Sequence, residues 1–321
     1  MNQKLVKILT MMKVLREMED QIYKARAYDR VIKNIIKYDK EIETINEASK
    51  ISGVGTNILS KIQNIFHNTD DQKTGIYELD SLSDEDYNKL FTIVDMIDIS
   101  GIGIKTAERM YNDGIRTIEQ IQQIGTTRQK IGAQYLEHIN KRINREDIDN
   151  FNQMLTNFVD NTGITFFIGG SYSRGLNTSS DVDILFYYPG TDPGTDPGTD
   201  INYANEVIEE LKNQGIILET LSFNDQHFEG IANIGNSNTI ITRLDIWFIS
   251  DITEIPYFML YIIGNEKLNR DMRSKAMSLG MTLTNNKMTD NKTGNKILVD
   301  DERDIFKILN IPYLEYNERN L

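Results

Sequence analysis

The amino-acid sequence contains no cysteine among its 321 residues. Disulfide bonds, cysteine-bound zinc and thiol catalysis are therefore excluded, and any metal must be held by oxygen atoms or by the three histidines. The sequence also lacks an apolar run as long as a membrane span, and its first residues lack the apolar core of a secretory signal. We therefore expect a soluble, intracellular protein that makes no membrane contact.

Positive charge is scarce as well, because 35 Lys and Arg stand against 48 Asp and Glu, for a net charge of −13. Phosphate binding rests on Lys and Arg, so the whole chain is not expected to bind nucleic acid indiscriminately. Residues 1–50 differ, with 11 Lys and Arg against 8 Asp and Glu. A basic N-terminal module on an acidic body predicts local, salt-sensitive binding to DNA.

The length suits two to four compact units. Residues 5–45 have helical apolar spacing, whereas from residue 152 onward the pattern indicates an α+β unit. Its expected elements are strands at 165–169, 184–188 and 240–248 and a helix at 204–214. Pro-Gly-Thr-Asp occurs three times over residues 189–200, which predicts a surface loop to which we assign no function.

A short glycine motif occurs twice in the first half of the chain. Ile-Ser-Gly-Val-Gly-Thr at 51–56 and Ile-Ser-Gly-Ile-Gly-Ile at 99–104 each precede an amphipathic run. The glycines permit a tight turn, and backbone N–H groups at the start of the next helix can bind a DNA phosphate without reading sequence. The repeat therefore favours two helix-hairpin-helix units, with two ordinary helix connections as the alternative.

A glycine turn and three aspartates mark the second half. Residues 169–183 read Gly-Gly-Ser-Tyr-Ser-Arg-Gly-Leu-Asn-Thr-Ser-Ser-Asp-Val-Asp, so Asp181 and Asp183 share one face of a strand. Asp245 stands alone in the apolar run 240–249 and needs a partner. Carboxylates and substrate phosphates suit Mg²⁺, so three aspartates predict a two-metal site. The alternative for an Asp-x-Asp pair is a solvated strand face or a turn flank.

These motifs resemble the nucleotidyltransferase superfamily, and with the two hairpins they resemble the family X DNA polymerases of the beta type. The resemblance covers nearly the whole chain and includes residues 261–273 and 299–306. It implies an α+β fold with helical helix-hairpin-helix domains, then a palm with a mixed sheet and a small α+β thumb. The implied domains are a lyase-like domain at 1–79, a DNA-binding subdomain at 80–144, a palm at 145–251 and a nucleotide-selecting subdomain at 252–321.

The resemblance also implies roles for individual residues. Asp181, Asp183 and Asp245 would hold two Mg²⁺ ions, for which Mn²⁺ can substitute, and Asp245 would act as the base for the primer 3′-hydroxyl. The implied nucleotide-binding residues are Arg142, Gly170, Ser171, Arg174, Ser179, Tyr261, Ile262, Gly264, Glu266 and Asn269. The implied DNA-binding residues are Lys24, Tyr28, Gly53, Gly55, Asn57, Gly101, Gly103, Arg243 and Arg273, with Na⁺ or K⁺ at the hairpin turns. For Glu266, plain solvation on a helix surface remains an equal alternative.

A second chemistry is implied for Lys61, which falls where the family places a lysine that attacks the C1′ aldehyde of an abasic sugar phosphate. Lysine suits this role because its uncharged amine forms an imine. Lys24 and Tyr28 match surrounding pocket residues, whereas Asn57 replaces a second pocket lysine. The alternative is that Lys61 only contacts phosphate.

Together these features predict a monomeric, gap-filling DNA polymerase of base excision repair with deoxyribose-phosphate lyase activity. Its implied partners are gapped or nicked DNA with a 5′-phosphate, deoxynucleoside triphosphates and a DNA ligase. A template-independent, RNA or small-molecule nucleotidyltransferase would not need the hairpins, and a non-enzymatic gap binder would not need the aspartates. The expected location is the nucleus or, for a viral protein, a cytoplasmic replication site or the virion.

Overall fold

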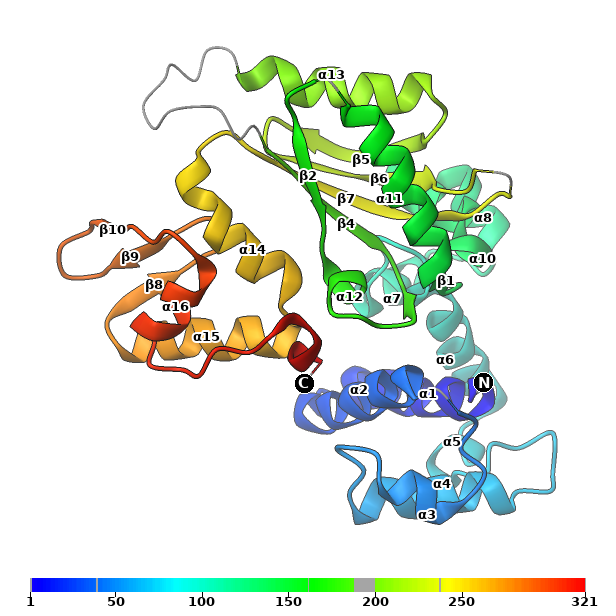
Figure 1. The fold of residues 1–321 in the computed structure, drawn as a ribbon. Helices are drawn as coiled ribbons and strands as arrows, with labels where there is room; N and C mark the ends of the chain where they lie inside the picture. The colour runs from blue at the N-terminus through cyan, green and yellow to red at the C-terminus, as the bar shows by residue number, and fades with distance from the viewer. Residues whose placement is uncertain (1, 39, 161, 188–199, 237, 321) are drawn as a thin grey trace. The chain divides into compact units, whose positions relative to one another are not determined.

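The computed structural model describes residues 2–38, 40–160, 162–187, 200–236 and 238–320 (Figure 1). Within them the chain divides into two compact units, residues 1–136 and 137–321. The first unit is helical and the second combines helices with sheets, so the expected α+β fold class is confirmed. No helix among the described residues is long and apolar enough to cross a membrane.

The first unit consists of short helices around one hydrophobic core. Its largest fully buried side chains include Leu9, Met12, Ile35 and Ile62. The helices are α1 (Gln3–Met18), α2 (Ile22–Lys37), α3 (Ile45–Ser49), α4 (Thr56–His67), α5 (Tyr77–Asp80), α6 (Asp84–Ile97), α7 (Ile104–Asn112), α8 (Ile118–Ile124) and α9 (Thr127–Gln134). The core is continuous across residue 80, and the expected division into four domains remains a prediction.

Both glycine motifs form the same turn, as the sequence repeat predicts. Gly53 has φ +90° and Gly101 has φ +85°, a region that L side chains rarely adopt, so glycine is required there. The next glycine of each motif is extended and caps the following helix, Gly55 before α4 and Gly103 before α7. The helix-hairpin-helix architecture is therefore present in two copies.

The second unit is built on a five-stranded mixed sheet in the order β2-β4-β7-β6-β5. The parallel pair is β4 with β7, and the other neighbours are antiparallel. The strands are β2 (Thr165–Ile168), β4 (Val182–Tyr187), β5 (Ile217–Asn224), β6 (His227–Asn233) and β7 (Ile241–Ile249). A two-stranded pair, β1 (Ile143–Asn144) with β3 (Thr178–Ser179), and the short helices α10 (Leu136–Ile139) and α12 (Gly170–Ser173) complete this part.

The sequence pattern locates three of these strands within two residues but does not reveal β5 and β6. The more buried face of β5 carries Ile217, Glu219, Leu221 and Phe223, so a charged residue interrupts the apolar pattern that would mark the strand in the sequence. The expected helix at 204–214 is α13 (Asp200–Asn213). The Pro-Gly-Thr-Asp repeat lies outside the described residues except for Asp200.

Alternation along the strands gives the sheet two different faces. Ile184 and Phe186 of β4 point to a core covered by α13 and by α11 (Arg145–Val159), as Figure 1 shows. Leu185 of β4 and Trp247 of β7 point to the opposite face, which α14 (Ile255–Ile263) covers. Asp183 and Asp245 belong to this second face because each lies two residues before one of these side chains.

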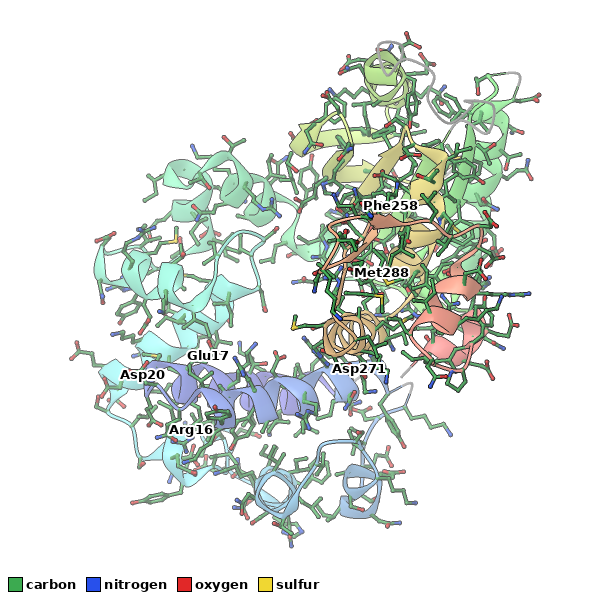
Figure 2. All side chains as sticks on the ribbon, turned by 90° about the vertical axis from the view of Figure 1, so that its left-hand side faces the viewer. Arg16, Glu17, Asp20, Phe258, Asp271 and Met288 are labelled. Carbon is green, nitrogen blue, oxygen red and sulfur yellow. The ribbon has the colours of Figure 1, made fainter. Side chains whose placement is uncertain are left out.

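The C-terminal part has its own core around Tyr257, Met272 and Phe306, and Met288 belongs to it (Figure 2). Its elements are the 3₁₀ segment η2 (Ile252–Glu254), α15 (Glu266–Ser278), β8 (Met281–Leu283), β9 (Met288–Asp290), β10 (Lys296–Ile297), α16 (Glu302–Ile308) and η3 (Tyr316–Arg319). The small sheet has the order β10-β9-β8.

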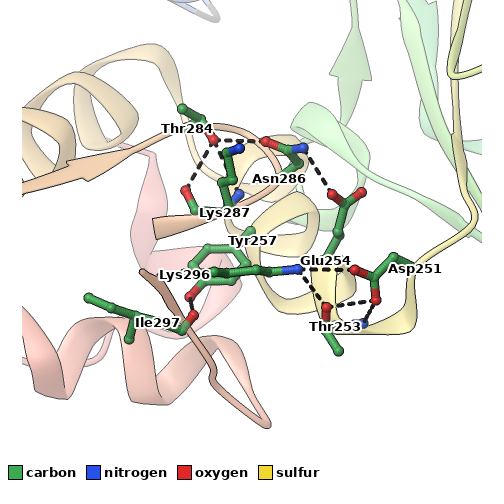
Figure 3. A network of polar contacts seen from close by, with 9 residues as sticks. All are labelled: Asp251, Thr253, Glu254, Tyr257, Thr284, Asn286, Lys287, Lys296 and Ile297. Atoms are coloured by element: carbon green, nitrogen blue, oxygen red, sulfur yellow. Dashed lines mark hydrogen bonds and ion pairs between the residues drawn. The ribbon is translucent and has the colours of Figure 1, made fainter. Parts of the chain in front are cut away.

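Polar contacts attach this small sheet to the start of α14 (Figure 3). The Tyr257 hydroxyl donates to the Ile297 carbonyl at 2.5 Å, and Lys296 Nζ lies 3.1 Å from Asp251 Oδ2. Asn286 Nδ2 donates to Glu254 Oε1 at 2.9 Å. These bonds hold α14, which carries Tyr261 and Ile262, against the C-terminal core.

Candidate active site

The three aspartates stand at one end of the two parallel strands. Asp183 of β4 and Asp245 of β7 are direct register partners, and Asp181 precedes β4 by one residue. Both strands run the same way, so their side chains at this level project from the same face of the sheet. The structure therefore brings together the carboxylates that the sequence pattern paired.

The surroundings of these carboxylates oppose their ionisation. Burial raises the pKa of Asp183, and the negative charges of Asp181 and Asp245 raise it further. Burial also raises the pKa of Asp181, while Arg243 opposes this effect. The three carboxylates repel one another in a partly buried site, and the neighbouring basic side chains do not fully neutralise them. A bound cation would stabilise their ionised form.

The glycine turn lies directly against the aspartates. Gly170 has φ +60°, and a Cβ there would collide with Asp183 Oδ2. A Cβ on Gly169 would collide with the side chain of Ile262. Glycine is therefore needed at both positions, because the turn is pressed between the Asp183 carboxylate and α14.

Hydroxyl groups and a guanidinium border this turn. Ser171 Oγ donates to Ser179 Oγ at 2.7 Å, and Ser179 is buried. Arg142 donates from Nε to Thr178 Oγ1 at 2.9 Å and from Nη1 to Ser180 Oγ at 3.0 Å. The β1 and β3 pairing thus places these expected phosphate contacts along one edge of the site.

Two basic side chains contact the aspartates directly. Arg243 Nη2 lies 3.5 Å from Asp181 Oδ2. His227 Nε2 lies 3.3 Å from Asp245 Oδ1, and its ring stacks on Trp247 with centroids 4.0 Å apart. His227 was not found from the sequence, because it stands on β6, whose strand pattern is not visible there.

Arg174 is held by groups from distant parts of the chain. Its Nη1 donates to the Ile263 carbonyl at 2.8 Å, and its Nε donates to Asn320 Oδ1 at 3.0 Å. Asn320 Nδ2 donates back to the Arg174 carbonyl at 3.1 Å. This reciprocal pair connects the glycine turn to the C-terminal segment, and Asn320 is another residue that the sequence did not reveal.

The expected nucleotide-facing residues of α14 and α15 fall into two groups. Asn269 Nδ2 donates to the Tyr261 carbonyl at 2.8 Å, and the Arg273 guanidinium lies 5.8 Å from the Tyr261 ring centroid. Gly264 is at the same junction, where a Cβ would lie 3.0 Å from Asn269 Oδ1. Glu266, by contrast, is exposed and lies 3.6 Å from Arg270, which suits the helix-surface alternative.

The chemistry of this site fits a hard divalent cation, since carboxylate oxygens are the ligands that Mg²⁺ prefers. Among the described residues, however, no three or more acidic or histidine side chains already stand in metal-binding geometry. Arg243 and His227 instead hold two of the carboxylates. The expected metal site therefore stays a prediction that requires these carboxylates to reorient.

The N-terminal unit gathers another polar cluster around Lys61 on α4. Lys61 Nζ contacts Glu78 Oε1, and Arg16 Nη2 lies 3.2 Å from the same oxygen. Burial raises the pKa of the Tyr28 hydroxyl, and the positive charge of Arg16 opposes this effect. The structure thus links Tyr28 to Lys61 through Arg16 and Glu78, neither of which the sequence singled out.

The remaining expected DNA contacts have simpler surroundings. Lys24 on α2 and Asn57 on α4 are exposed. The Gly53 turn lies against Arg30, and the Gly101 turn lies against Arg128. Each hairpin turn therefore has a basic side chain packed beside it, which suits a phosphate-binding role.

Four family models match consecutive parts of the chain. They are a helix-hairpin-helix domain at residues 1–70, the fingers domain of DNA polymerase lambda at 95–140, the DNA polymerase beta palm at 142–251 and the DNA polymerase beta thumb at 258–320. Together these four matches cover most of the sequence.

Curated relatives agree with these matches. DNA polymerase lambda of Rattus norvegicus is 27% identical over 93% of this chain and 52% of its own length. DNA polymerase lambda of Arabidopsis thaliana is 27% identical over 92% and 58%, and DNA nucleotidylexotransferase of Xenopus laevis is 26% identical over 75% and 54%. The chain spans about half the length of these relatives. With its palm, thumb, fingers and hairpin segments all matched in order, the chain belongs to the family X DNA polymerases.

Proposed function

We propose that this protein is a DNA-directed DNA polymerase that fills short gaps during base excision repair. The observation that carries the proposal is the register pairing of Asp183 with Asp245, directly against the Gly170 turn. Nucleotidyl transfer needs clustered carboxylates that can hold divalent ions, with a phosphate-binding turn beside them. Two helix-hairpin-helix turns in the same chain support DNA as the substrate.

In this proposal Asp181, Asp183 and Asp245 hold the divalent ions, Mg²⁺ or Mn²⁺. When bound, such ions neutralise charge on the triphosphate and activate the primer hydroxyl. Asp245 accepts the proton of the primer 3′-hydroxyl, whose oxygen then bonds to the α-phosphorus as pyrophosphate leaves. Arg142, Ser171, Arg174 and Ser179 bind the triphosphate, because guanidinium and hydroxyl groups suit crowded phosphate oxygens.

The α14 and α15 residues bind the sugar and base in the same scheme. The Tyr261 and Ile262 backbone lies under the sugar, while Asn269 and Arg273 face the nascent base pair. The hydrogen bond from Asn269 to the Tyr261 carbonyl supports a common role for these two residues in binding the nucleotide. Glu266 is left out of this set, because its side chain is exposed and paired with Arg270.

We propose that the hairpin turns bind the DNA backbone on the two sides of a gap, with Na⁺ or K⁺ at the turns. Backbone N–H groups at the start of α4 and α7 would contact phosphate oxygens. Binding should favour a gap with a 5′-phosphate and weaken steeply with salt, because the basic N-terminal module meets that phosphate while the rest of the chain is acidic. The product is a nick, which is the substrate of a DNA ligase.

The proposed second activity is removal of a deoxyribose phosphate through Lys61. The neutral amine adds to the C1′ aldehyde and loses water to form an imine. A C2′ proton then leaves to a base, the C3′–O bond breaks, and the DNA strand departs with its 5′-phosphate. The buried Tyr28 hydroxyl, linked to Lys61 through Arg16 and Glu78, supports a built pocket at this position.

One relative favours a second candidate, template-independent nucleotide addition, because it is named DNA nucleotidylexotransferase. The two candidates differ in their need for a template. Incubation with a one-nucleotide gapped duplex, Mg²⁺ and each single triphosphate should extend the primer only with the complementary nucleotide. Extension of single-stranded DNA with equal efficiency would favour the second candidate, and no extension of either DNA would leave only a gap-binding role.

We further propose that the enzyme acts as a monomer inside the cell. The three relatives come from a rat, a plant and a frog, which supports a nuclear repair setting rather than a viral one. Sedimentation with gapped DNA would test the stoichiometry, since a one-to-one complex is expected and a two-to-one complex would contradict it.

A further inference from the structure

Two cations of the N-terminal unit converge on one carboxylate oxygen. Lys61 on α4 and Arg16 on α1 both contact Oε1 of Glu78, although the three residues lie on separate helices. One oxygen between an ammonium and a guanidinium has the surroundings that a phosphate oxygen needs in a binding site. The place that a phosphate would take beside Lys61 is therefore filled by a side chain of the protein.

The two cationic side chains are less exposed to solvent than the Glu78 carboxylate. Arg16 and Lys61 are 13% and 18% exposed, whereas Glu78 is 36% exposed. The cations form the inner wall and the carboxylate is the outer member of the cluster. Glu78 can therefore rotate into solvent while Arg16 and Lys61 stay in place.

The backbone that carries Glu78 is firmly anchored. Asp80 accepts hydrogen bonds from the Thr74 and Gly75 backbone N–H groups at 2.8 and 3.1 Å. Ile76 and Leu79 on either side of Glu78 are buried. The Glu78 side chain can thus change position while its backbone stays in place, which is what a displaceable group requires.

We propose that Glu78 is an internal counterion that occupies the anion position between Lys61 and Arg16 and must leave it before a 5′-phosphate end of DNA can bind there. The proposal rests on the lyase function assigned to Lys61. In the free protein the ion pair with Glu78 keeps the Lys61 amine engaged, so that the amine is not available to an aldehyde. Lys61 and Arg16 keep the Glu78 pKa below its usual value, against the effect of burial, so Glu78 stays ionised near neutral pH.

The direct test is Glu78→Gln, which keeps the shape of the side chain and removes its charge. Formaldehyde with cyanoborohydride is the probe: the Lys61 amine adds to the aldehyde carbon and loses water, and hydride reduces the imine to a methylated amine. Mass spectrometry of proteolytic peptides gives the labelling rate of Lys61 relative to the exposed Lys4. We expect the ratio to rise about two- to fivefold in Glu78→Gln, the range of a partly exposed ion pair.

Asp71→Asn is the matched control, because it removes the same charge from an exposed position between α4 and α5. It should leave the labelling ratio unchanged. In the wild-type protein, high salt should raise the ratio by screening the ion pair, whereas steric burial of Lys61 would not respond to salt. This wild-type measurement decides the matter even if Glu78→Gln does not fold.

Binding to DNA gives a second readout. The gain in affinity for gapped DNA from a 5′-phosphate, relative to a 5′-hydroxyl, should be larger in Glu78→Gln than in wild type or Asp71→Asn. Unchanged labelling and an unchanged phosphate gain would overturn the counterion role, even if wild-type Lys61 is trapped on an abasic end. If labelling rises but no abasic end is ever trapped, the counterion role holds and the lyase proposal fails.

Discussion

Gly170 and Asp183 are in contact, so that no side chain can be added to the glycine without moving the carboxylate. At φ +60°, Gly170→Ala also strains the backbone by about 1–3 kcal/mol. We expect the variant to fold with reduced stability and to lose at least about tenfold in nucleotide addition, because Asp183 is displaced. Gapped-primer extension and thermal unfolding would measure both effects.

Gly175→Ala is the control for this variant, since Gly175 has φ +78° and a Cβ there would meet nothing within 4 Å. It should show the same backbone strain without the loss of activity. Equal activity losses in the two variants would mean that the contact with Asp183 is irrelevant to catalysis.

The reciprocal pair between Arg174 and Asn320 should compete with the triphosphate for the Arg174 guanidinium. Asn320→Asp removes the Nδ2 donor to the Arg174 carbonyl but gives Arg174 Nε a charged acceptor, so that the guanidinium is held more firmly. We expect KM for the nucleotide to rise about two- to tenfold with a small change in kcat. Asn317→Asp adds the same charge nearby and should leave KM unchanged, and a rise there as large would point to general charge repulsion.

Ile262 bears on the choice between deoxyribo- and ribonucleotides. Its side chain is buried and fills the space beside Gly169, so Ile262→Phe overpacks this core by about 1–3 kcal/mol. We expect stronger rejection of ribonucleotides in the variant, because the larger ring stiffens the backbone under the sugar. The ratio of kcat/KM for a matched nucleotide pair tests this, and an unchanged or lower ratio would refute it.

A pH-dependent effect is expected between α1 and α2. Lys13 Nζ lies 2.7 Å from Asp29 Oδ1, and Lys13 and Lys33 hold the Asp29 pKa below its usual value against the effect of burial. A depressed folded-state pKa contributes stability above the unfolded pKa near 4 and loses it as pH falls through the folded value. Lys13→Met should therefore cost about 0.5–1 kcal/mol at pH 7.

The destabilisation by Lys13→Met should shrink as the pH falls from 7 to well below 4, where Asp29 becomes protonated in the folded state as well. Urea unfolding at the two pH values measures it. Lys33→Met serves as the comparison, since its contact with Asp29 Oδ2 is longer, at 3.2 Å, and its side chain is 55% exposed. A cost for Lys13→Met that is the same at both pH values would show that packing rather than charge is responsible.

How well a feature could be predicted from the sequence depends on how far apart along the chain the interacting residues lie. The turns at Gly53 and Gly101 depend on local backbone geometry, so a repeated glycine motif was enough to predict them. Asp183 and Asp245 could be paired because both interrupt apolar strands that needed a common neighbour. Each of these features is indicated by residues within short segments of the sequence.

Other features depend on side chains that meet across long separations. Arg174 and Asn320 are 146 residues apart, and no local pattern in the sequence pairs one with the other. Glu78 contacts Lys61 because of the way α4 and α5 pack together, and charge composition alone does not reveal this packing. Such contacts become visible only when the packing of the elements is known.

The central claim, that the aspartate pair performs nucleotidyl transfer, is tested most directly by Asp245→Ala on a one-nucleotide gap. Primer extension and gapped-DNA affinity should be measured on the same preparation, with thermal unfolding to confirm the fold. The account predicts that extension is lost while affinity stays near the wild-type value, because the carboxylate serves metal binding and proton transfer rather than DNA docking. Extension at a near wild-type rate by Asp245→Ala would contradict it.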